Sequence, residues 1–357
     1  MNIFFNKNCY NLNSLDKLVE AAPFFEEGIK FIQQFSCGQP TFEFKTSGAT
    51  GMAKMITITR RQILASIKQT ENALGLKKGE TVLVCLSPGF VATKMMLARC
   101  MKIGMDIVLK KPSSNPFESL DVDDQIDFAS FVPLQVQHII DSEHTNILDG
   151  IRNILIGGGP ISLGLEYSLS TSKSNIYHTY GMTESVSHIA LRKLNSGNKL
   201  FEILGDTLAH RNDDGCLSVK GEITNNQTVE TNDLVEFEDK RHFKWLGRKD
   251  NLINSGGVKI ISEAVEEFLA PLMTDIQITS DFFLYGIKDN LLGEKLIMIV
   301  EGEIQSKSIF KHIANPLKTK FGKYHIPKEI YWVREFTRTS SGKIKRKATL
   351  ELIKGEL

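Results

Sequence analysis

The chain has 357 residues, which is enough for about two domains with a sizeable core. Its 43 Lys and Arg residues nearly balance its 42 Asp and Glu residues, and the net charge of +1 indicates no nucleic-acid or anionic-membrane partner. Five scattered cysteines have no paired spacing, so neither a disulfide framework nor a zinc site is predicted. The chain shows no secretory signal and no apolar run as long as a membrane span, so we expect a cytoplasmic protein.

Residues 1–40 are predicted to form helices, because their apolar residues recur at helical spacing. Two short strands are expected next, one containing Phe42 and Phe44 and the other residues 55–58. An amphipathic helix is predicted over Arg60–Leu74, ended by Gly75.

The loop between the two short strands combines glycines, hydroxyl side chains and a lysine. Gly48 and Gly51 allow backbone amides to turn toward one point, and further donors come from Thr46, Ser47, Thr50 and Lys54. Together these groups suit a polyphosphate. The loop is not a Walker loop, because the glycine-lysine-serine ending is absent. A solvated hairpin turn is the alternative, and the loop alone favours it.

Strand–helix pairs then follow one another along the chain. A buried strand over Thr81–Leu86 precedes a helix over Val91–Ile103, a strand is predicted over Asp106–Leu109, and two more pairs occupy residues 128–140 and 151–169. This alternation predicts a mainly parallel sheet, with ligands bound at the carboxyl ends of its strands.

After these pairs, two regions with different predicted secondary structure follow. Short strands with Asn, Asp and Gly turns predict a small β-rich subdomain over residues 187–245. A small α+β domain follows, with helices over 263–269 and 304–321 and strands over 281–287, 296–300 and 329–333. The expected fold class is therefore α/β, with a large N-terminal domain and a small C-terminal domain.

Six segments in one order carry a family resemblance. They are FKTSGATGMAKMIT (44–57), RNILIGGGP (152–160), IYHTYGMTESVS (176–187), Thr-Asn-Asp (231–233), WLGRKDNLINSGGVKII (245–261) and the basic stretch 337–347. They resemble the motifs of the acyl-adenylate-forming enzymes, the superfamily of acyl-CoA synthetases, luciferases and peptide-synthetase adenylation domains. The resemblance spans residues 44–348 and implies an acyl-CoA synthetase-like fold that binds ATP, Mg²⁺ and coenzyme A.

The resemblance implies a role for each motif in nucleotide binding. The phosphates would be bound by Thr46, Ser47, Gly48, Thr50, Gly51 and Lys54. The adenine would lie against Gly157, Gly158, Gly159, Tyr180 and Gly181, and the ribose against Asp233 and Arg248. Thr183 would contact the α-phosphate, and Glu184 would bind the magnesium ion.

The resemblance also implies a division into two domains that move. Residues 1–249 would bind ATP and the acid, and residues 250–357 would be a mobile domain that carries the catalytic Lys343, with Asp250 as the hinge. After rotation, Gly256 and Gly257 would approach the nucleotide and bind coenzyme A.

The chain departs from the family pattern at five points. Ala49, Ala53, Asn232 and Thr337 stand where a hydroxyl residue, proline, glycine and proline are usual. Only about forty-five residues precede the phosphate loop, where relatives have well over a hundred. We therefore expect an N-terminally shortened fold, with consequences for acyl specificity or dimerisation.

The overall pattern is most similar to the compact o-succinylbenzoate–CoA ligases of menaquinone biosynthesis. The second carboxylate of that acid needs a donor, and Ser187, His188 and Arg192 are candidates. For His188, a structural histidine on an alternating strand is at least as plausible. We expect a small carboxylic acid as partner, no nucleic acid and no membrane span, and we allow for a homodimer.

Two alternatives stay open. One is a different acid–thiol ligase, acting on an aryl or fatty acid or loading a carrier protein. The other is a nucleotide-binding regulator without turnover, which the departures from the pattern favour and the retained Lys343 and Glu184 oppose.

Overall fold

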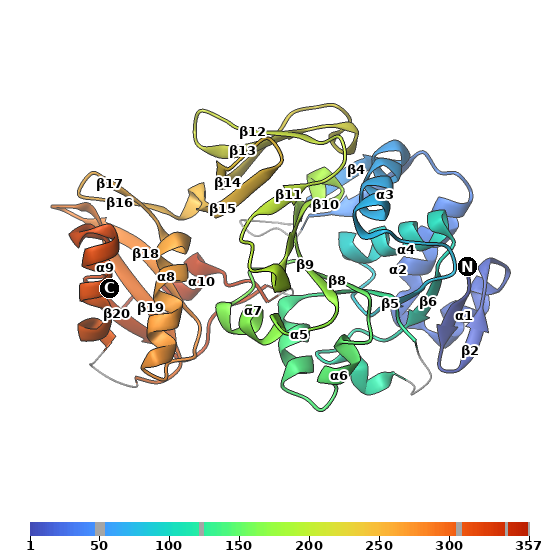
Figure 1. Cartoon of the computed structure of the whole chain (residues 1–357), viewed down its shortest axis with the longest axis horizontal. Helices are drawn as coiled ribbons and strands as arrows, with labels where there is room; N and C mark the ends of the chain where they lie inside the picture. The colour runs from blue at the N-terminus through green and yellow to red at the C-terminus, as the bar shows by residue number, and fades with distance from the viewer. Residues whose placement is uncertain (47–53, 121–124, 305–308, 340–341, 356–357) are drawn as a thin grey trace. The chain divides into compact units, whose positions relative to one another are not determined.

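The computed structural model of the chain describes residues 1–46, 54–120, 125–304, 309–339 and 342–355 (Figure 1). These residues form two compact units. The first consists of Met1–His210, Ser218–Glu230 and Phe237–Phe243, and the second of Arg211–Leu217, Thr231–Glu236 and Lys244–Leu357. The functional boundary at residues 249 and 250 stays a prediction.

The parallel sheet predicted from the strand–helix alternation is present. It contains β1 (Ile3–Phe5), β5 (Thr81–Val84), β6 (Asp106–Leu109), β7 (Phe128–Phe131), β8 (Asn153–Ile156) and β9 (Asn175–Met182). The parallel pairs are β1 with β6, β6 with β5, β5 with β7, β7 with β8 and β8 with β9. Because the strands are parallel, the segments that follow β8 and β9 leave the sheet at their carboxyl ends.

The predicted helical start of the chain is wrong for residues 1–10. This segment forms β1 and β2 (Asn8–Tyr10), an antiparallel pair at the edge of the sheet. Ile3 and Phe5 are buried while Phe4 is exposed, which is strand alternation. A 3₁₀ turn at Leu12–Ser14 follows, and the first α-helices are α1 (Leu15–Ala21) and α2 (Glu26–Ser36).

Helices cover both faces of the parallel sheet (Figure 1). Val82 and Val84 of β5 pack in a core with α1, α2, α3 (Arg60–Leu74) and α4 (Val91–Ile103). Leu83 and Cys85 pack on the opposite face, in a core with α5 (Pro133–Ile140) and α7 (Leu163–Leu169). The short α6 (Thr145–Leu148) adds Leu148 to this second core. Burial on both faces explains why β5 is apolar throughout.

The β-rich stretch extends this sheet. Its strands are β10 (Ser187–Lys193), β11 (Phe201–Ile203), β12 (Leu208–Arg211), β13 (Cys216–Lys220), β14 (Val229–Phe237) and β15 (His242–Arg248). β10 pairs antiparallel with β9, β11 with β10, and β15 with β11. The whole sheet has 13 strands in the order β12-β13-β14-β15-β11-β10-β9-β8-β7-β5-β6-β1-β2.

The second unit contains the predicted α+β arrangement. Its five-stranded sheet is built from β16 (Leu252–Ser255), β17 (Val258–Ile261), β18 (Phe282–Asp289), β19 (Gly293–Glu301) and β20 (Glu329–Val333). Helices α8 (Ser262–Asp275) and α9 (Ile309–Phe321) pack on one face. Phe336 and the segment around α10 (Arg346–Glu351) pack on the other.

Candidate active site

The hairpin expected to bind phosphate is formed by β3 (Thr41–Lys45) and β4 (Met55–Thr59). Beyond the paired strands, the Thr46 amide donates to the Lys54 carbonyl at 2.8 Å, and the Lys54 amide donates to Thr46 Oγ1 at 3.0 Å. Hydrogen bonding between the two arms of the hairpin therefore continues from the paired strands to Thr46 and Lys54, where the loop begins and ends. The other predicted phosphate ligands, Ser47, Gly48, Thr50 and Gly51, lie outside the described residues.

The three glycines expected beside adenine follow β8. A Cβ at Gly157 would lie 2.2 Å from Thr179 Oγ1, and Gly158 has a φ of +84°, which a side chain rarely adopts. The Gly159 carbonyl lies 3.3 Å from Nε2 of His178. Burial and the charge of Arg192 lower the pKa of His178 to about 4, so this imidazole is neutral at pH 7. The backbone of the three glycines therefore carries no side chains and lies beside a neutral imidazole.

Tyr180 and Gly181 lie at the end of β9, where it turns toward β10. The Tyr180 ring makes edge contacts with Phe201 and Phe243, at centroid distances of 5.8 and 5.4 Å. A Cβ at Gly181 would lie 2.0 Å from the Ser187 carbonyl oxygen. The two strands can approach this closely only because residue 181 has no side chain.

The turn that carries Thr183 and Glu184 is strained. It is the 3₁₀ turn Thr183–Ser185, followed by Val186 at a φ of 57° and Ser187 at 95°. Positive φ is rare for a β-branched residue and is found at functional sites. Ser66 Oγ donates to the Val186 carbonyl at 3.1 Å and stabilises the turn, a contact that the sequence analysis missed. Glu184 itself is exposed.

The side chains around Glu184 indicate what kind of magnesium site it could form. Among the described residues, no group of three or more His, Cys, Asp or Glu side chains is arranged to hold a metal ion. Mg²⁺ bound with a nucleotide usually takes one or two carboxylates, with phosphates and water supplying the remaining ligands. A single exposed carboxylate therefore fits magnesium brought in with ATP.

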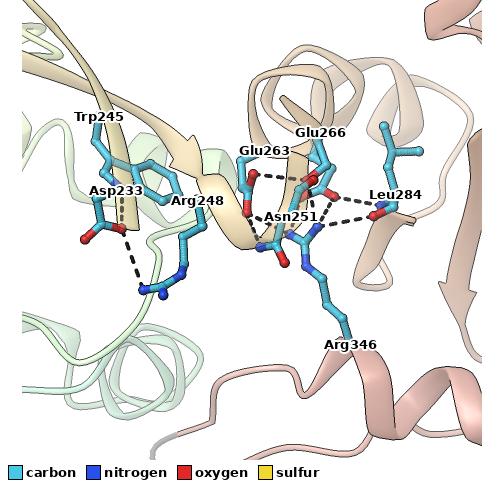
Figure 2. A network of polar contacts seen from close by, with 9 residues as sticks. Asp233, Trp245, Arg248, Asn251, Glu263, Glu266, Leu284 and Arg346 are labelled. Atoms are coloured by element: carbon cyan, nitrogen blue, oxygen red, sulfur yellow. Dashed lines mark hydrogen bonds and ion pairs between the residues drawn. The ribbon is translucent and has the colours of Figure 1, made fainter. Parts of the chain in front are cut away.

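The residues expected at the ribose form a cluster in the second unit (Figure 2). Trp245 Nε1 donates to Asp233 Oδ1 at 3.1 Å, and Arg248 Nη1 lies 3.8 Å from the same oxygen. The Asp233 amide donates to Thr231 Oγ1 at 3.1 Å. The sequence analysis gave Trp245 no role, although it stands three residues before Arg248, which was predicted to contact the ribose.

Replacing Trp245 with phenylalanine is expected to raise the KM for ATP about five-fold with little change in kcat. The indole hydrogen bond orients Asp233, and one such bond contributes about 1 kcal/mol. Loss of binding shared by the ground and transition states appears in KM alone. Steady-state kinetics check this, with Trp332→Phe as control because Trp332 packs in the core against α8 and α9. A fall in kcat with KM unchanged would contradict it.

The predicted hinge residue Asp250 has two side-chain partners. Arg248 Nη2 donates to Asp250 Oδ2 at 2.7 Å, and Asn232 Nδ2 lies 3.4 Å from both carboxylate oxygens. Asn232 is one of the departures from the family pattern, so its side chain adds a contact that glycine could not make.

Gly256 and Gly257 form the two-residue turn between β16 and β17, where Ser255 pairs with Val258. Their φ values of 60° and 80° belong to the left-handed region that such hairpin turns require. A Cβ at Gly256 would lie 2.6 Å from the Tyr324 ring. Glycine is therefore needed at position 256 both for the backbone conformation of the turn and for its close contact with the Tyr324 ring.

Lys343 lies on a short hairpin in which the Thr339 amide donates to its carbonyl at 2.8 Å. Burial lowers the pKa of Lys343 from its ordinary value, the charge of Arg248 acts in the same direction, and Asp233 opposes both. Lys343, Arg248 and Asp233 are thus within electrostatic reach of one another in the second unit.

All three residues suggested for a second carboxylate already have a side-chain contact within the protein. His188 Nε2 lies 2.9 Å from Thr70 Oγ1, and burial together with the charge of Arg99 lowers its pKa well below the ordinary value. Arg192 forms a bidentate ion pair with Glu166, both distances being 3.1 Å. Ser187 is half-buried at the strained turn, and its Oγ lies 3.5 Å from Nδ1 of His188. Their assignment stays a prediction, and the geometry favours structural roles for His188 and Arg192.

No helix in the described ranges is both long and apolar enough to cross a membrane.

Known proteins resemble this chain at the level of sequence and fold. A 2-succinylbenzoate–CoA ligase of Staphylococcus epidermidis is 26% identical over 333 residues, which is 85% of this chain and 68% of the relative. One of Bacillus cytotoxicus is 25% identical over 370 residues, with 94% and 74% covered. The o-succinylbenzoate CoA synthetase of Bacillus subtilis in complex with its acyl-adenylate is 21% identical, with 85% and 68% covered and a TM-score of 0.73, so it shows the fold alone.

Another solved structure has a higher sequence identity and nearly the same extent as this chain. It is an acyl-CoA synthetase (AMP-forming)/AMP-acid ligase II-like protein of Dyadobacter fermentans, 36% identical, with 93% of this chain and 95% of that chain covered and a TM-score of 0.62. The model of the AMP-binding enzyme family matches residues 39–209, the stretch from the β3–β4 hairpin to β12. The expectation from the motifs is confirmed: the chain belongs to the AMP-binding enzymes, the AMP-forming acid–thiol ligases.

Proposed function

We propose that the protein converts 2-succinylbenzoate, ATP and coenzyme A into 2-succinylbenzoyl-CoA, AMP and pyrophosphate, a step of menaquinone biosynthesis. The observation that carries the reaction is the electrostatic interaction of Lys343 with Asp233 and Arg248, the residues proposed to bind the ribose, because an adenylating lysine must act beside the nucleotide. The acid is inferred from the curated relatives, which are named 2-succinylbenzoate–CoA ligases.

In the first half-reaction, an oxygen of the succinyl carboxylate attacks the α-phosphorus of ATP. The bond from carboxylate oxygen to phosphorus forms, the bond to the bridging oxygen breaks, and pyrophosphate leaves. Lys343 would donate to the oxygens on which negative charge builds, with Thr183 on the α-phosphate. A magnesium ion held by Glu184 would supply further neutralisation of the phosphates.

In the second half-reaction, the sulfur of coenzyme A attacks the acyl carbon, the thiol proton is released, and AMP leaves with the bonding electrons. Lys343 is not needed here. Rotation of residues 250–357 about Asp250 would withdraw it and bring Gly256 and Gly257 toward the nucleotide. ATP and coenzyme A are cytoplasmic metabolites, and we propose the cytoplasm as the site of action.

The test is pyrophosphate release from ATP and magnesium with four acids: 2-succinylbenzoate, its analogue without the ring carboxylate, benzoate and a fatty acid. We expect release with 2-succinylbenzoate alone and a thioester when coenzyme A is added. If the analogue without the ring carboxylate is turned over as fast as 2-succinylbenzoate, the enzyme does not recognise the second carboxylate. Transfer to a carrier protein in place of coenzyme A would favour a carrier-loading ligase. ATP binding without release from any acid would favour the regulator.

A further inference from the structure

The segment that presents Lys343 is a small hairpin, here called the lysine hairpin and comprising the described residues from Thr337 to Lys345. The Lys345 amide donates to the Thr337 carbonyl at 2.8 Å, and the Lys343 amide donates to Thr339 Oγ1 at 3.1 Å. A hairpin of this size buries too little surface to be rigid by itself. The groups that attach its two ends therefore decide how precisely the ammonium is held.

Arg346 attaches one end, directly after the lysine hairpin (Figure 2). Its Nη1 and Nη2 donate to the two carboxylate oxygens of Glu266 in α8, at 2.9 and 2.8 Å. Nη1 also donates to Ser262 Oγ at 3.0 Å and to the Leu284 carbonyl at 3.2 Å. A bidentate arginine–carboxylate pair with further acceptors fixes both the position and the plane of the guanidinium.

Arg338 attaches the opposite strand of the lysine hairpin. Its two terminal nitrogens each donate to one oxygen of Glu301, both at 2.6 Å, and Nη2 also donates to Asp281 at 2.7 Å. The hydrogen bond from Arg338 lowers the pKa of Glu301. Because Glu301 ends β19, this strand of the lysine hairpin is held on the five-stranded sheet.

Stability alone is a poor explanation for the Arg346 contact. Burial raises the pKa of Glu266, with Arg346 opposing this rise, so the carboxylate is in a site that disfavours its charge. Buried ion pairs contribute little net stability compared with apolar residues of the same volume, whereas they can specify one geometry. The bidentate contact is therefore better suited to precise placement.

The contacts continue toward the predicted hinge. Glu263 of α8 lies 3.6 Å from Arg346 and accepts a hydrogen bond from Asn251, the residue after Asp250. Ser262 Oγ also donates to the Asn251 carbonyl at 3.1 Å. The first turn of α8 thus contacts the lysine hairpin's anchor and the residue next to the hinge.

We propose that Arg346, through Glu266, is a positioning residue that holds Lys343 in place for adenylate formation, with Arg338 and Glu301 holding the other strand of the lysine hairpin. This inference rests on the proposed function, in which Lys343 acts in the first half-reaction only. It follows that a loosened anchor slows adenylation and spares thioester formation.

The principal variant is Arg346→Met, and Lys347→Met is its matched control, since Lys347 is exposed on the same helix. Arg346→Met is expected to slow adenylate formation by about 10- to 100-fold, the scale for misplacing a catalytic group by about 1 Å. Thioester formation from preformed acyl-adenylate is expected to stay within about two-fold, and Lys347→Met to change neither rate. Arg346→Lys is expected to restore little, because an ammonium cannot form the bidentate contact.

A double variant separates positioning from a general structural role. When Lys343 is already alanine, Arg346→Met is expected to cause no further loss of adenylation, because the group that it positions is gone. Additive losses, or equal losses in both half-reactions, would overturn the proposal. Should Arg346→Met fold poorly, Arg346→Met with Glu266→Gln removes both charges, and the same pattern is expected from it.

A measurement without substrate keeps this inference distinct from the proposed function. Acetylation of each lysine by acetic anhydride is followed by peptide mass spectrometry across pH. In wild type, burial and the charge of Arg248 lower the pKa of Lys343, with Asp233 opposing them, and its labelling midpoint is expected to move toward that of an ordinary lysine in Arg346→Met. An unchanged midpoint would overturn the positioning role even when the acid is not 2-succinylbenzoate.

Discussion

Lys343→Ala is expected to slow adenylate formation by about 10²- to 10³-fold, the scale for removing one donor that stabilises transition-state charge. Negative charge builds on the α-phosphate and the carboxylate together, and Lys343 is the cation proposed to meet it. Its lowered pKa has burial as its first cause, so the ammonium is partly desolvated and its interactions are stronger than in water. Thioester formation from preformed acyl-adenylate is expected to proceed at the wild-type rate.

The two half-reactions are measured separately, by pyrophosphate release without coenzyme A and by thioester formation from synthetic acyl-adenylate. Lys347→Ala is the control, because this exposed lysine follows in the same basic stretch. Equal losses in both half-reactions for Lys343→Ala would remove the lysine from its assigned role. Loss in Lys347→Ala as well would point to a general effect of charge.

Gly181→Ala is expected to destabilise the first unit by about 3 kcal/mol, the upper part of the usual range for overpacking. The added Cβ would lie 2.0 Å from the Ser187 carbonyl oxygen and 2.5 Å from His188 Cα. These are backbone atoms of β10, so no side-chain rotation relieves the clash and β9 and β10 must separate. Tyr180 and Thr183 would move with the strand end, and ATP binding should weaken in the molecules that fold.

Denaturant unfolding with a binding assay for ATP measures both effects. Gly164→Ala is the matched control, because this glycine lies in α7 and a Cβ there meets nothing within 4 Å. It should leave stability unchanged or raise it by up to about 1 kcal/mol, as alanine favours the helix. Coinciding unfolding midpoints for Gly181→Ala and wild type would show that the strands can separate at no cost.

Local patterns predicted the elements that local forces determine. The bounds of α3 and α4 agree with the sequence analysis because their ends are marked by Gly75 and Gly104, both in the left-handed conformation. The strand at residues 3–5 was missed because it is only three residues long. It pairs with the nearby β2, but it joins the parallel sheet through β6, which lies about a hundred residues away in the chain. Strand formation depends on such distant pairing more than on local preference.

The same division holds for the candidate site. Reactive groups concentrated in short glycine-containing loops were recognisable from the sequence, since a nucleotide requires particular donors and bare backbone within a few residues. The contacts that orient these groups were not, because Trp245 reaches Asp233 across 12 residues and Arg346 reaches Glu266 across 80. The sequence by itself thus determined the family and the chemical groups. Only the tertiary structure decided which side chains hold these groups in place. A hydrogen bond depends on the distance between two atoms in space, and local sequence patterns do not reveal which distant residues come together.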